Sequence, residues 1–287
     1  MHLHIIAPIN PNQFIKSDIA SYRLRLSYVY NAAIELGFLV TGGLEVPDNA
    51  NIYYIGKITK EMDKKFFFNI INKISKNKSL VLTDYTDDWL SISESKNKEI
   101  YSELIKIDSK IIVPVFGLAQ QLHKRGINAF VIPDGIDNIP NNKPSPKNNK
   151  TKNVLWHGHS SNIKSVLRIL EKDLVDYNFN LHLVSSSFAF NIIKNTKFLK
   201  KPKCKLIAHL WDIKKLQDVS KKCDFAILPT DKNWASANRL VTTFRLGLPI
   251  IAETISSYSE YSNFYSKFNK SEIKNMFYSP EKWYKSV

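Results

Sequence analysis

Residues 224–253 (DFAILPTDKNWASANRLVTTFRLGLPIIAE) combine residue types that suit a bound diphosphate. We expect a buried strand that ends at Pro229, a polar loop, a helix capped by Ser236, and a second strand after Gly247. The first turn of that helix favours an anion, and Arg239 adds a cation beside it. The alternative is that Arg239 is a solvated charge on a polar helix surface. The residues expected to contact a ligand are Ser236, Asn238, Arg239, Thr242 and Thr243.

His157 and Gly158 stand at the end of another expected strand, NVLWHG. Ligands of open α/β sheets bind beyond the carboxyl ends of the strands, so both residues are placed in the candidate binding site. His157 either donates a hydrogen bond to a phosphate or a ligand hydroxyl, or it satisfies a nearby carbonyl group. His159 is expected in a turn. Two histidines without a third ligand make a poor zinc site, so no metal is expected there.

Asp84 closes an expected strand and is followed by Asp87 and Asp88 in LVLTDYTDDW. This spacing allows either a Mg²⁺ site of the D-x-D kind or a structural or acceptor-side role, and we favour the second. Asp18 and Asp84 are the candidates for a general base.

Two arginines and two further carboxylates complete the candidates in the first half of the chain. Arg23 and Arg25 are placed on the first long helix; being two residues apart, at least one is expected to be solvated or ion-paired. Asp134 and Asp137, in PDGID, are expected to serve turn chemistry. Gly135 would permit a left-handed conformation in that turn, and the carboxylates are expected to bond nearby N–H groups.

Short β-branched runs alternate with amphipathic stretches along the chain, which is typical of βαβ units and parallel sheets. Two series are visible, and each predicts a small Rossmann-like domain of the α/β class. The first has strands at 2–7, 51–56, 79–84, 110–115 and 128–133, with helices at about 18–36, 61–76, 94–107 and 116–125. The second has strands at 153–158, 179–185, 204–209, 224–229 and 248–252, with helices near 162–175, 188–199, 212–222 and 236–246. No structure is assigned from Tyr258 onwards.

Residues 138–152 separate the two series. They contain three prolines and many asparagines and lysines without apolar periodicity, so we expect a linker. The expected organisation is an amino-terminal domain (1–137), this linker and a carboxyl-terminal domain (153–287).

Several motifs, in their order along the chain, resemble GT-B glycosyltransferases, especially bacterial enzymes of capsule and lipopolysaccharide biosynthesis. The similar segments are ASYRLR, LVLTDYTDDW, VIPDGID, NVLWHGHSSN, and SANR with GLPIIA. The resemblance implies two Rossmann-like domains facing a central cleft, with a nucleotide sugar on the second and a saccharide or lipid-linked saccharide acceptor on the first. It also implies transfer without a metal or other cofactor. Arg239, His157 and Asp84 are then the candidate catalytic residues, and cations and N–H donors near the leaving diphosphate supply much of the catalysis.

One difference from that family concerns the donor helix. Many retaining members carry glutamates in an E-x7-E pattern, whereas Trp234 and Thr242 occupy those places in this sequence. The nucleotide base, the donor sugar and the retaining or inverting outcome therefore stay open.

The net charge favours an anionic partner. Lysine and arginine number 41 against 26 aspartates and glutamates, which gives +15 over 287 residues. No glycine-rich phosphate loop and no recognised nucleic-acid module is present, so a dehydrogenase, a P-loop ATPase and a nucleic-acid partner are disfavoured. A nucleic-acid-binding protein and a catalytically inactive scaffold of the same fold remain the alternatives.

A cytoplasmic location is expected. Cys204 and Cys223 are too few for a disulfide framework, no apolar run reaches the length of a membrane span, and the amino end has no basic leader. Residues 62–78 combine phenylalanines and isoleucines with lysines. This pattern fits either a core-facing helix with a basic solvent face or a helix resting on anionic lipid, and we expect peripheral attachment at the inner face of the membrane through it.

Overall fold

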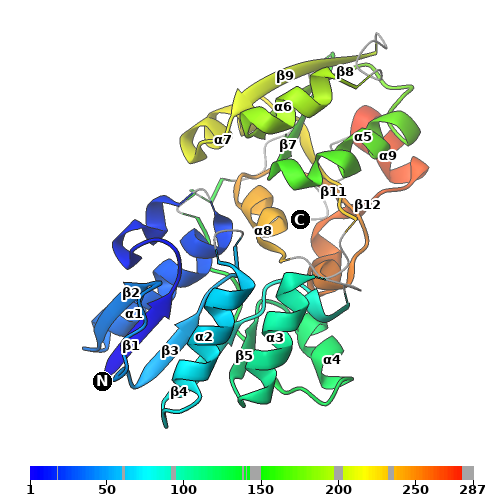
Figure 1. Cartoon of the computed structure of the whole chain (residues 1–287). Helices are drawn as coiled ribbons and strands as arrows, with labels where there is room; N and C mark the ends of the chain where they lie inside the picture. The colour runs from blue at the N-terminus through cyan, green and yellow to red at the C-terminus, as the bar shows by residue number, and fades with distance from the viewer. Residues whose placement is uncertain are drawn as a thin grey trace. The chain divides into compact units, whose positions relative to one another are not determined.

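The computed structural model describes residues 1–17, 19–59, 62–91, 95–137, 139, 141–142, 150–196, 203–231 and 236–279. Contacts divide the chain into two compact units. Unit 1 comprises Met1–Asp137 and Trp234–Ala237, and unit 2 comprises Asn138–Asn233 and Asn238–Val287. Each unit contains one six-stranded parallel sheet with helices packed on it (Figure 1).

The sheet of unit 1 has the strand order β2-β1-β3-β4-β5-β6. Its elements are β1 (His2–Ile6), η1 (Pro11–Lys16), η2 (Tyr22–Leu26, a π-helix), α1 (Ser27–Glu35), β2 (Leu39–Gly43), β3 (Ile52–Ile55), α2 (Lys64–Ile74), β4 (Leu80–Asp84), η3 (Trp89–Ser91), α3 (Lys96–Lys106), β5 (Lys110–Val113), α4 (Phe116–His123) and β6 (Ala129–Val131). In Figure 1, α2 and α3 lie on one side of this sheet and α1 lies on the other.

The core of unit 1 is built on its inner strands. A parallel strand inside a sheet is covered on both faces, and four of the five residues of β1 are buried accordingly. On the α1 side, Leu3 and Ile5 pack with Tyr54 of β3 and Ile112 of β5. Asp84, the last residue of β4, lies buried at the edge where the parallel strands of this sheet end.

The sheet of unit 2 has the order β12-β11-β10-β7-β8-β9. Its elements are β7 (Lys152–His157), η4 (Ser160–Asn162), α5 (Ile163–Lys172), β8 (Phe179–Ser185), α6 (Ser187–Lys194), β9 (Cys204–Leu210), α7 (Ile213–Ser220), β10 (Phe225–Leu228), α8 (Asn238–Arg245), β11 (Ile250–Ala252), η6 (Ser256–Phe264), β12 (Ser266–Lys267) and α9 (Lys270–Tyr278). The fully buried Trp156 of β7 packs with Val166, Ile169 and Leu170 of α5 in its core.

Both predicted series of strands and helices are confirmed, with small shifts at their ends. The prediction missed β2 and β12. Strand β2 ends in two glycines, which disfavour a strand, but Gly42 is needed because a Cβ there would lie 2.6 Å from Pro11. Most of the expected linker lies outside the described residues, and the expected central cleft stays a prediction.

Helix α2 corresponds to the expected basic amphipathic helix. Its apolar residues Phe67, Ile70, Ile71 and Ile74 are buried, so the core-facing alternative is the one the structure shows. The apolar side that attachment to lipid through this helix requires is covered, which corrects that expectation. In the described part of the chain, no helix combines the length and the apolar character needed to span a bilayer.

Candidate functional site

The candidate site of unit 2 lies where β7 ends and α8 begins. Gly158, directly after β7, has a φ of +155°, which other residues rarely adopt. A Cβ at this position would stand 3.3 Å from Cδ and 3.4 Å from Nη1 of Arg239, and 3.3 Å from the ring of Trp156. The missing side chain of Gly158 therefore makes the space that the Arg239 side chain occupies.

Arg239, in the first turn of α8, is partly buried. Its Nη1 is buried and has no hydrogen-bond partner among the described residues. A buried donor left unpaired costs about 1–3 kcal/mol, so such a group usually has a partner that the protein alone does not supply. This geometry does not fit the alternative of a solvated surface charge.

His157, the last residue of β7, ties that strand to α8. Its Nε2 lies 2.8 Å from the hydroxyl of Thr243, and that hydroxyl donates to the carbonyl oxygen of Arg239 at 2.7 Å. The Thr243 hydroxyl must then accept from His157, which places the histidine proton on Nε2 and leaves Nδ1 unprotonated. Burial and the nearby Arg239 lower the pKa of His157 to about 3, and Trp211 stacks on its ring. His157 is therefore a neutral residue that positions the start of α8, and its N–H is used within the fold.

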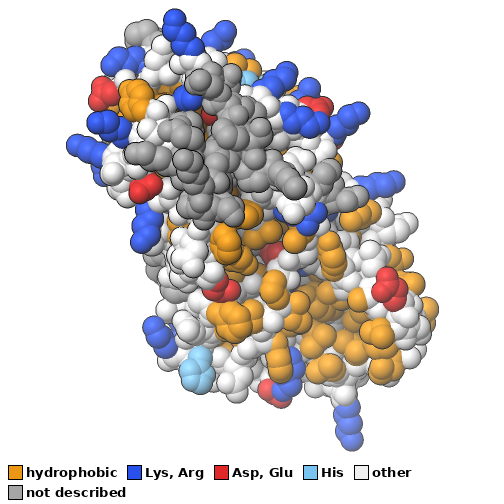
Figure 2. All heavy atoms as spheres, turned by 180° about the vertical axis from the view of Figure 1, so that it is seen from behind, with side chains coloured by type: hydrophobic (Ala, Val, Ile, Leu, Met, Phe, Trp, Pro, Cys, Tyr) orange, Lys and Arg blue, Asp and Glu red, His pale blue; other side chains and the backbone are white. Residues whose placement is uncertain are grey.

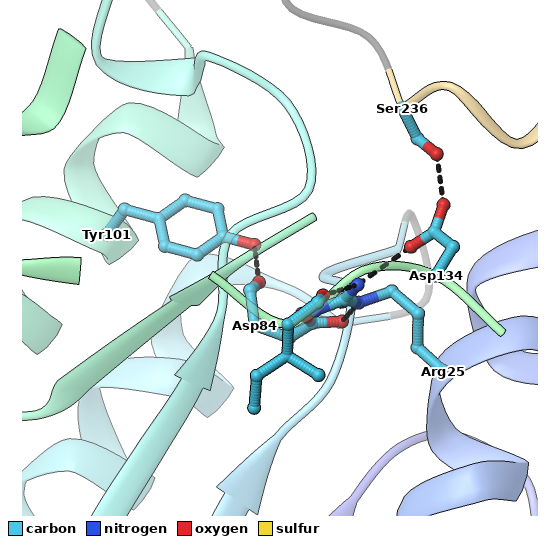
Figure 3. A network of polar contacts seen from close by, with 6 residues as sticks. Arg25, Asp84, Tyr101, Asp134 and Ser236 are labelled. Atoms are coloured by element: carbon cyan, nitrogen blue, oxygen red, sulfur yellow. Dashed lines mark hydrogen bonds and ion pairs between the residues drawn. The ribbon is translucent and has the colours of Figure 1, made fainter. Parts of the chain in front are cut away.

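The other candidates of the segment 224–253 belong to two different groups of residues. Thr243 and Thr242 are buried, and Asn238 is the first residue of α8. The Ser236 hydroxyl, which the sequence places as a helix cap, donates to the carboxylate of Asp134, and both residues belong to unit 1 (Figure 3). The structure thus brings His157, Gly158, Arg239 and Thr243 together and directs Ser236 to a different group of residues.

The second group is a buried network around Arg25 of η2 (Figure 3). Arg25 Nε lies 2.7 Å from Asp84 Oδ1, and its Nη1 lies 2.7 Å from Asp134 Oδ1. The Tyr101 hydroxyl donates to the Asp84 carbonyl oxygen at 3.0 Å. Burial alone would lower the pKa of Arg25, but the two carboxylates outweigh it and raise that pKa above its usual value.

This network changes the interpretation of Asp84. Its side chain is fully buried, and both carboxylate oxygens accept from Arg25. Burial raises the pKa of the Asp84 carboxyl while Arg25 acts in the opposite direction. A carboxylate enclosed in this way cannot reach a substrate, so the geometry assigns Asp84 a positioning role in place of the expected catalytic one.

Asp134 and Asp137 also differ from the expected turn chemistry. Asp134 pairs with Arg25, and Asp137 pairs with Arg23, so both arginines are ion-paired. Gly135 does not have a positive φ. A glycine is needed there because a Cβ would lie 2.2 Å from the ring of Tyr28.

The other acidic candidates have structural partners. Asp87 lies 3.5 Å from the Lys57 ammonium, and Asp88 accepts from the Tyr85 hydroxyl at 3.1 Å. Asp18 lies outside the described residues. Among the residues that the structure describes, no three histidine, cysteine or acidic side chains are grouped as a metal site requires.

Two carboxylates at the edge of the unit 2 sheet were not predicted. Asp231 follows β10 and Glu253 follows β11, and both accept from Nη2 of Arg168, at 3.1 and 2.7 Å. Ser165 also donates to Asp231, at 2.6 Å. An acidic residue directly after a buried strand, as in LPIIAE, was the signal that could have identified Glu253.

No family model and no curated protein sequence matches the chain. Solved structures do match. Anabaena HepE in complex with UDP and glucose has a TM-score of 0.65, 12% identity, and covers 99% of this chain and 92% of its own; HepE is also solved with UDP-glucose. The catalytic domain of starch synthase IV from Arabidopsis thaliana, bound to ADP and acarbose, has a TM-score of 0.53 and 10% identity. The match covers 93% of this chain and 71% of the starch synthase chain. TarM has a TM-score of 0.56 and 12% identity, and the match covers 82% of this chain and 49% of the TarM chain. These likenesses show the fold: two Rossmann-like α/β units of the GT-B type.

Proposed function

We propose that the chain is a glycosyltransferase that moves a sugar from a nucleotide-activated donor to a saccharide or lipid-linked saccharide acceptor. The role we assign is cell-surface polysaccharide assembly, such as capsule or lipopolysaccharide. The location we assign is the cytoplasm at the inner face of the membrane, where the charge of +15 attracts anionic lipid. Transfer is proposed to need no metal, because Arg239 and the N–H groups of α8 supply positive potential for the leaving diphosphate.

The observation that carries this proposal is the Nη1 of Arg239 beside Gly158, which is buried and has no hydrogen-bond partner in the described part of the chain. It lies past the carboxyl end of β7, next to the first turn of a helix, which is where α/β sheets bind phosphate groups. The UDP, UDP-glucose and ADP bound to structural neighbours agree in chemistry with a nucleoside diphosphate at such a site. Glu253 and Asp231 add carboxylate oxygens on the same edge of the sheet, and these can accept from ligand hydroxyls.

A melting-temperature panel with the full chain tests the proposal. UDP, GDP, dTDP, CMP and their sugars are each added at millimolar concentration, with Mg²⁺ and with EDTA. A ligand present at about 100 times its Kd adds about 2.7 kcal/mol to the stability of the folded form. We expect one nucleotide and its sugar to raise the melting temperature equally with Mg²⁺ and with EDTA. No shift with any nucleotide would contradict nucleotide-sugar transfer, and a shift seen only with Mg²⁺ would contradict metal independence.

A further inference from the structure

Ser236 belongs to unit 1, but the helix that follows it along the chain, α8, belongs to unit 2. Only Ala237 separates Ser236 from this helix, and Ala237 is buried. Two residues of chain reach at most about 7 Å, so a bond that fixes Ser236 also limits where α8 begins. Arg239, the residue that carries the proposed function, lies in the first turn of α8.

The carboxylate that holds Ser236 is itself held by a buried cation. The Ser236 hydroxyl donates to Oδ2 of Asp134, and Oδ1 of the same carboxylate accepts from Nη1 of Arg25 at 2.7 Å (Figure 3). Figure 2 shows lysine and arginine side chains projecting from one face of the molecule, whereas the Arg25 side chain is 4% exposed. Arg25 Nη1 also donates to the Ile132 carbonyl at 3.0 Å. Ser236 is therefore anchored to a buried network of hydrogen bonds and ion pairs.

The start of α8 is built without a capping side chain at the position directly before the helix. At other helices that side chain accepts a hydrogen bond from a first-turn N–H: Asp63 before α2, Ser95 before α3, Asp212 before α7 and Asn269 before α9. Ala237, directly before α8, has no side-chain oxygen. The N–H groups of a first turn are the ones that a bound anion uses, and no side chain at this position competes for them.

We propose that Ser236 is a positioning residue of the nucleotide-sugar site and that Asp134 is the group that holds it. The inference rests on the proposed function, because it concerns how Arg239 is aimed at the leaving diphosphate. His157 and Thr243 hold the Arg239 carbonyl from one side. The bond to Asp134 restrains the chain just before the helix. A cation that is already fixed in place binds its ligand at a smaller cost in conformational entropy.

In this role Ser236 acts on the ligand through Arg239. It needs no contact with the ligand itself, which differs from the ligand contact expected from the sequence.

Calorimetric titration of the full chain with UDP, GDP, dTDP and ADP tests the inference. Ser236→Ala removes the hydroxyl, whereas Ser236→Thr keeps it. Ser79→Ala is the matched control, because Ser79 is also a partly buried serine of unit 1, and its hydroxyl donates to the Ala50 carbonyl at 2.7 Å. It directly precedes β4, at the other end of that strand from Asp84. Melting temperatures verify that all variants are folded.

We expect the Kd of the bound nucleotide to be about 10-fold higher in Ser236→Ala. The Kd should be unchanged in Ser236→Thr and in Ser79→Ala. Since Ser236 acts through Arg239, adding Ser236→Ala to Arg239→Ala should change the Kd less than about twofold, whereas independent contributions would multiply. An unchanged Kd in Ser236→Ala would overturn the inference, and so would a full 10-fold effect in the Arg239→Ala background.

Asp134→Asn tests the other side of the bond. The amide is a weaker acceptor than the carboxylate, so the Kd should rise in this variant too. Adding Ser236→Ala to it should then have a smaller effect than in the unchanged chain. Equal affinity in Asp134→Asn and the unchanged chain would contradict the role of Asp134, and the Ser236 variants decide the inference even if Asp134→Asn is too unstable to titrate.

The same titrations separate this inference from the proposed function. An unchanged chain that binds none of the nucleotides would overturn both. An unchanged chain that binds one of them, with equal affinity in Ser236→Ala, would overturn the positioning role alone.

Discussion

Arg25 and Arg239 each lie against the end of a strand in a Rossmann-like unit, but their charges are used differently. The side chain of Arg25 is 4% exposed and binds two carboxylates, Asp84 and Asp134. No ion pair holds Arg239 among the described residues, and its buried Nη1 has no partner there. The first arginine is compensated within the protein and joins segments far apart in the sequence. Arg239 keeps an N–H donor for a ligand. Whether carboxylates of the protein pair with the charge is therefore what separates a structural arginine from a candidate binding residue.

The largest effect is expected from removing the compensated arginine. Arg25→Ala leaves the buried Asp84 carboxylate without its partner and should lower the free energy of unfolding by about 3–5 kcal/mol. Urea denaturation measures this loss. Arg23→Ala is the matched control, because the Arg23 side chain is 14% exposed and its pair with Asp137 is more hydrated. Equal losses in the two variants would contradict the special role of the Arg25 network.

Arg239→Ala should act on the reaction and leave the fold intact. Removing one cation from the leaving-group site should slow sugar transfer about 100-fold, by analogy with the loss of one oxyanion donor. Arg239→Lys should restore the rate only in part, because an ammonium is a point charge and not a planar fork. Transfer rates and melting temperatures of the same variants check this. An unchanged rate in Arg239→Ala would remove the residue from the donor site.

Gly158→Ala tests the space that Arg239 needs. Its φ of +155° and the 3.3 Å approach to Arg239 Cδ predict a loss of about 1–3 kcal/mol in stability, together with weaker nucleotide binding. Gly126→Ala is the control, since Gly126 also has a positive φ but no atom within 4 Å of an added Cβ. If both variants bind nucleotide equally well, Gly158 does not serve the site.

An effect that is spread over several pH units, and is therefore small at any one pH step, is expected from His157. Its pKa is about 3 in the folded protein and near 6.5 when unfolded, so the unfolded chain binds more protons between these values. Stability therefore falls as the pH drops from about 6.5 to about 3, by at most about 1.4 kcal/mol per pH unit for this group. Burial also lowers the pKa of His4, to about 4, and that group acts in the same direction. In His157→Gln the dependence of unfolding free energy on pH should become shallower; an unchanged slope would contradict the buried neutral histidine.

The fold was predictable because hydrophobic periodicity is local. A pattern of a few neighbouring residues is enough to predict strand β1 and helix α5. The same holds for the strand ends that carry His157 and Glu253. Strand β2 was not predicted because its two glycines are typical of a loop. Only the structure shows that Pro11 lies too close to Gly42 for a side chain there.

The pairing of charges was not predictable in the same way. Asp134 lies beside a glycine and a proline, so local composition indicated a turn. Its partners Arg25 and Ser236 are 109 and 102 residues away, and nothing in a linear pattern states which arginine meets which carboxylate. Arg239 and Gly158 were identified because each stands at an element end. Their contact became visible only in three dimensions, and their role in binding stays a prediction.

Calorimetric titration of a nucleoside diphosphate tests the central claim most directly. The ligand is the one that raises the melting temperature, and the proteins are the unchanged chain, Arg239→Ala and Arg245→Ala. Arg245 is a matched control, because it is a cation on the same helix whose Nε and Nη2 donate to the Ile139 carbonyl at 3.0 and 2.6 Å. Loss of one charge-assisted hydrogen bond, about 2 kcal/mol, predicts a Kd about 30-fold higher in Arg239→Ala. The account predicts an unchanged Kd in Arg245→Ala. Equal affinity of the unchanged chain and Arg239→Ala would contradict it.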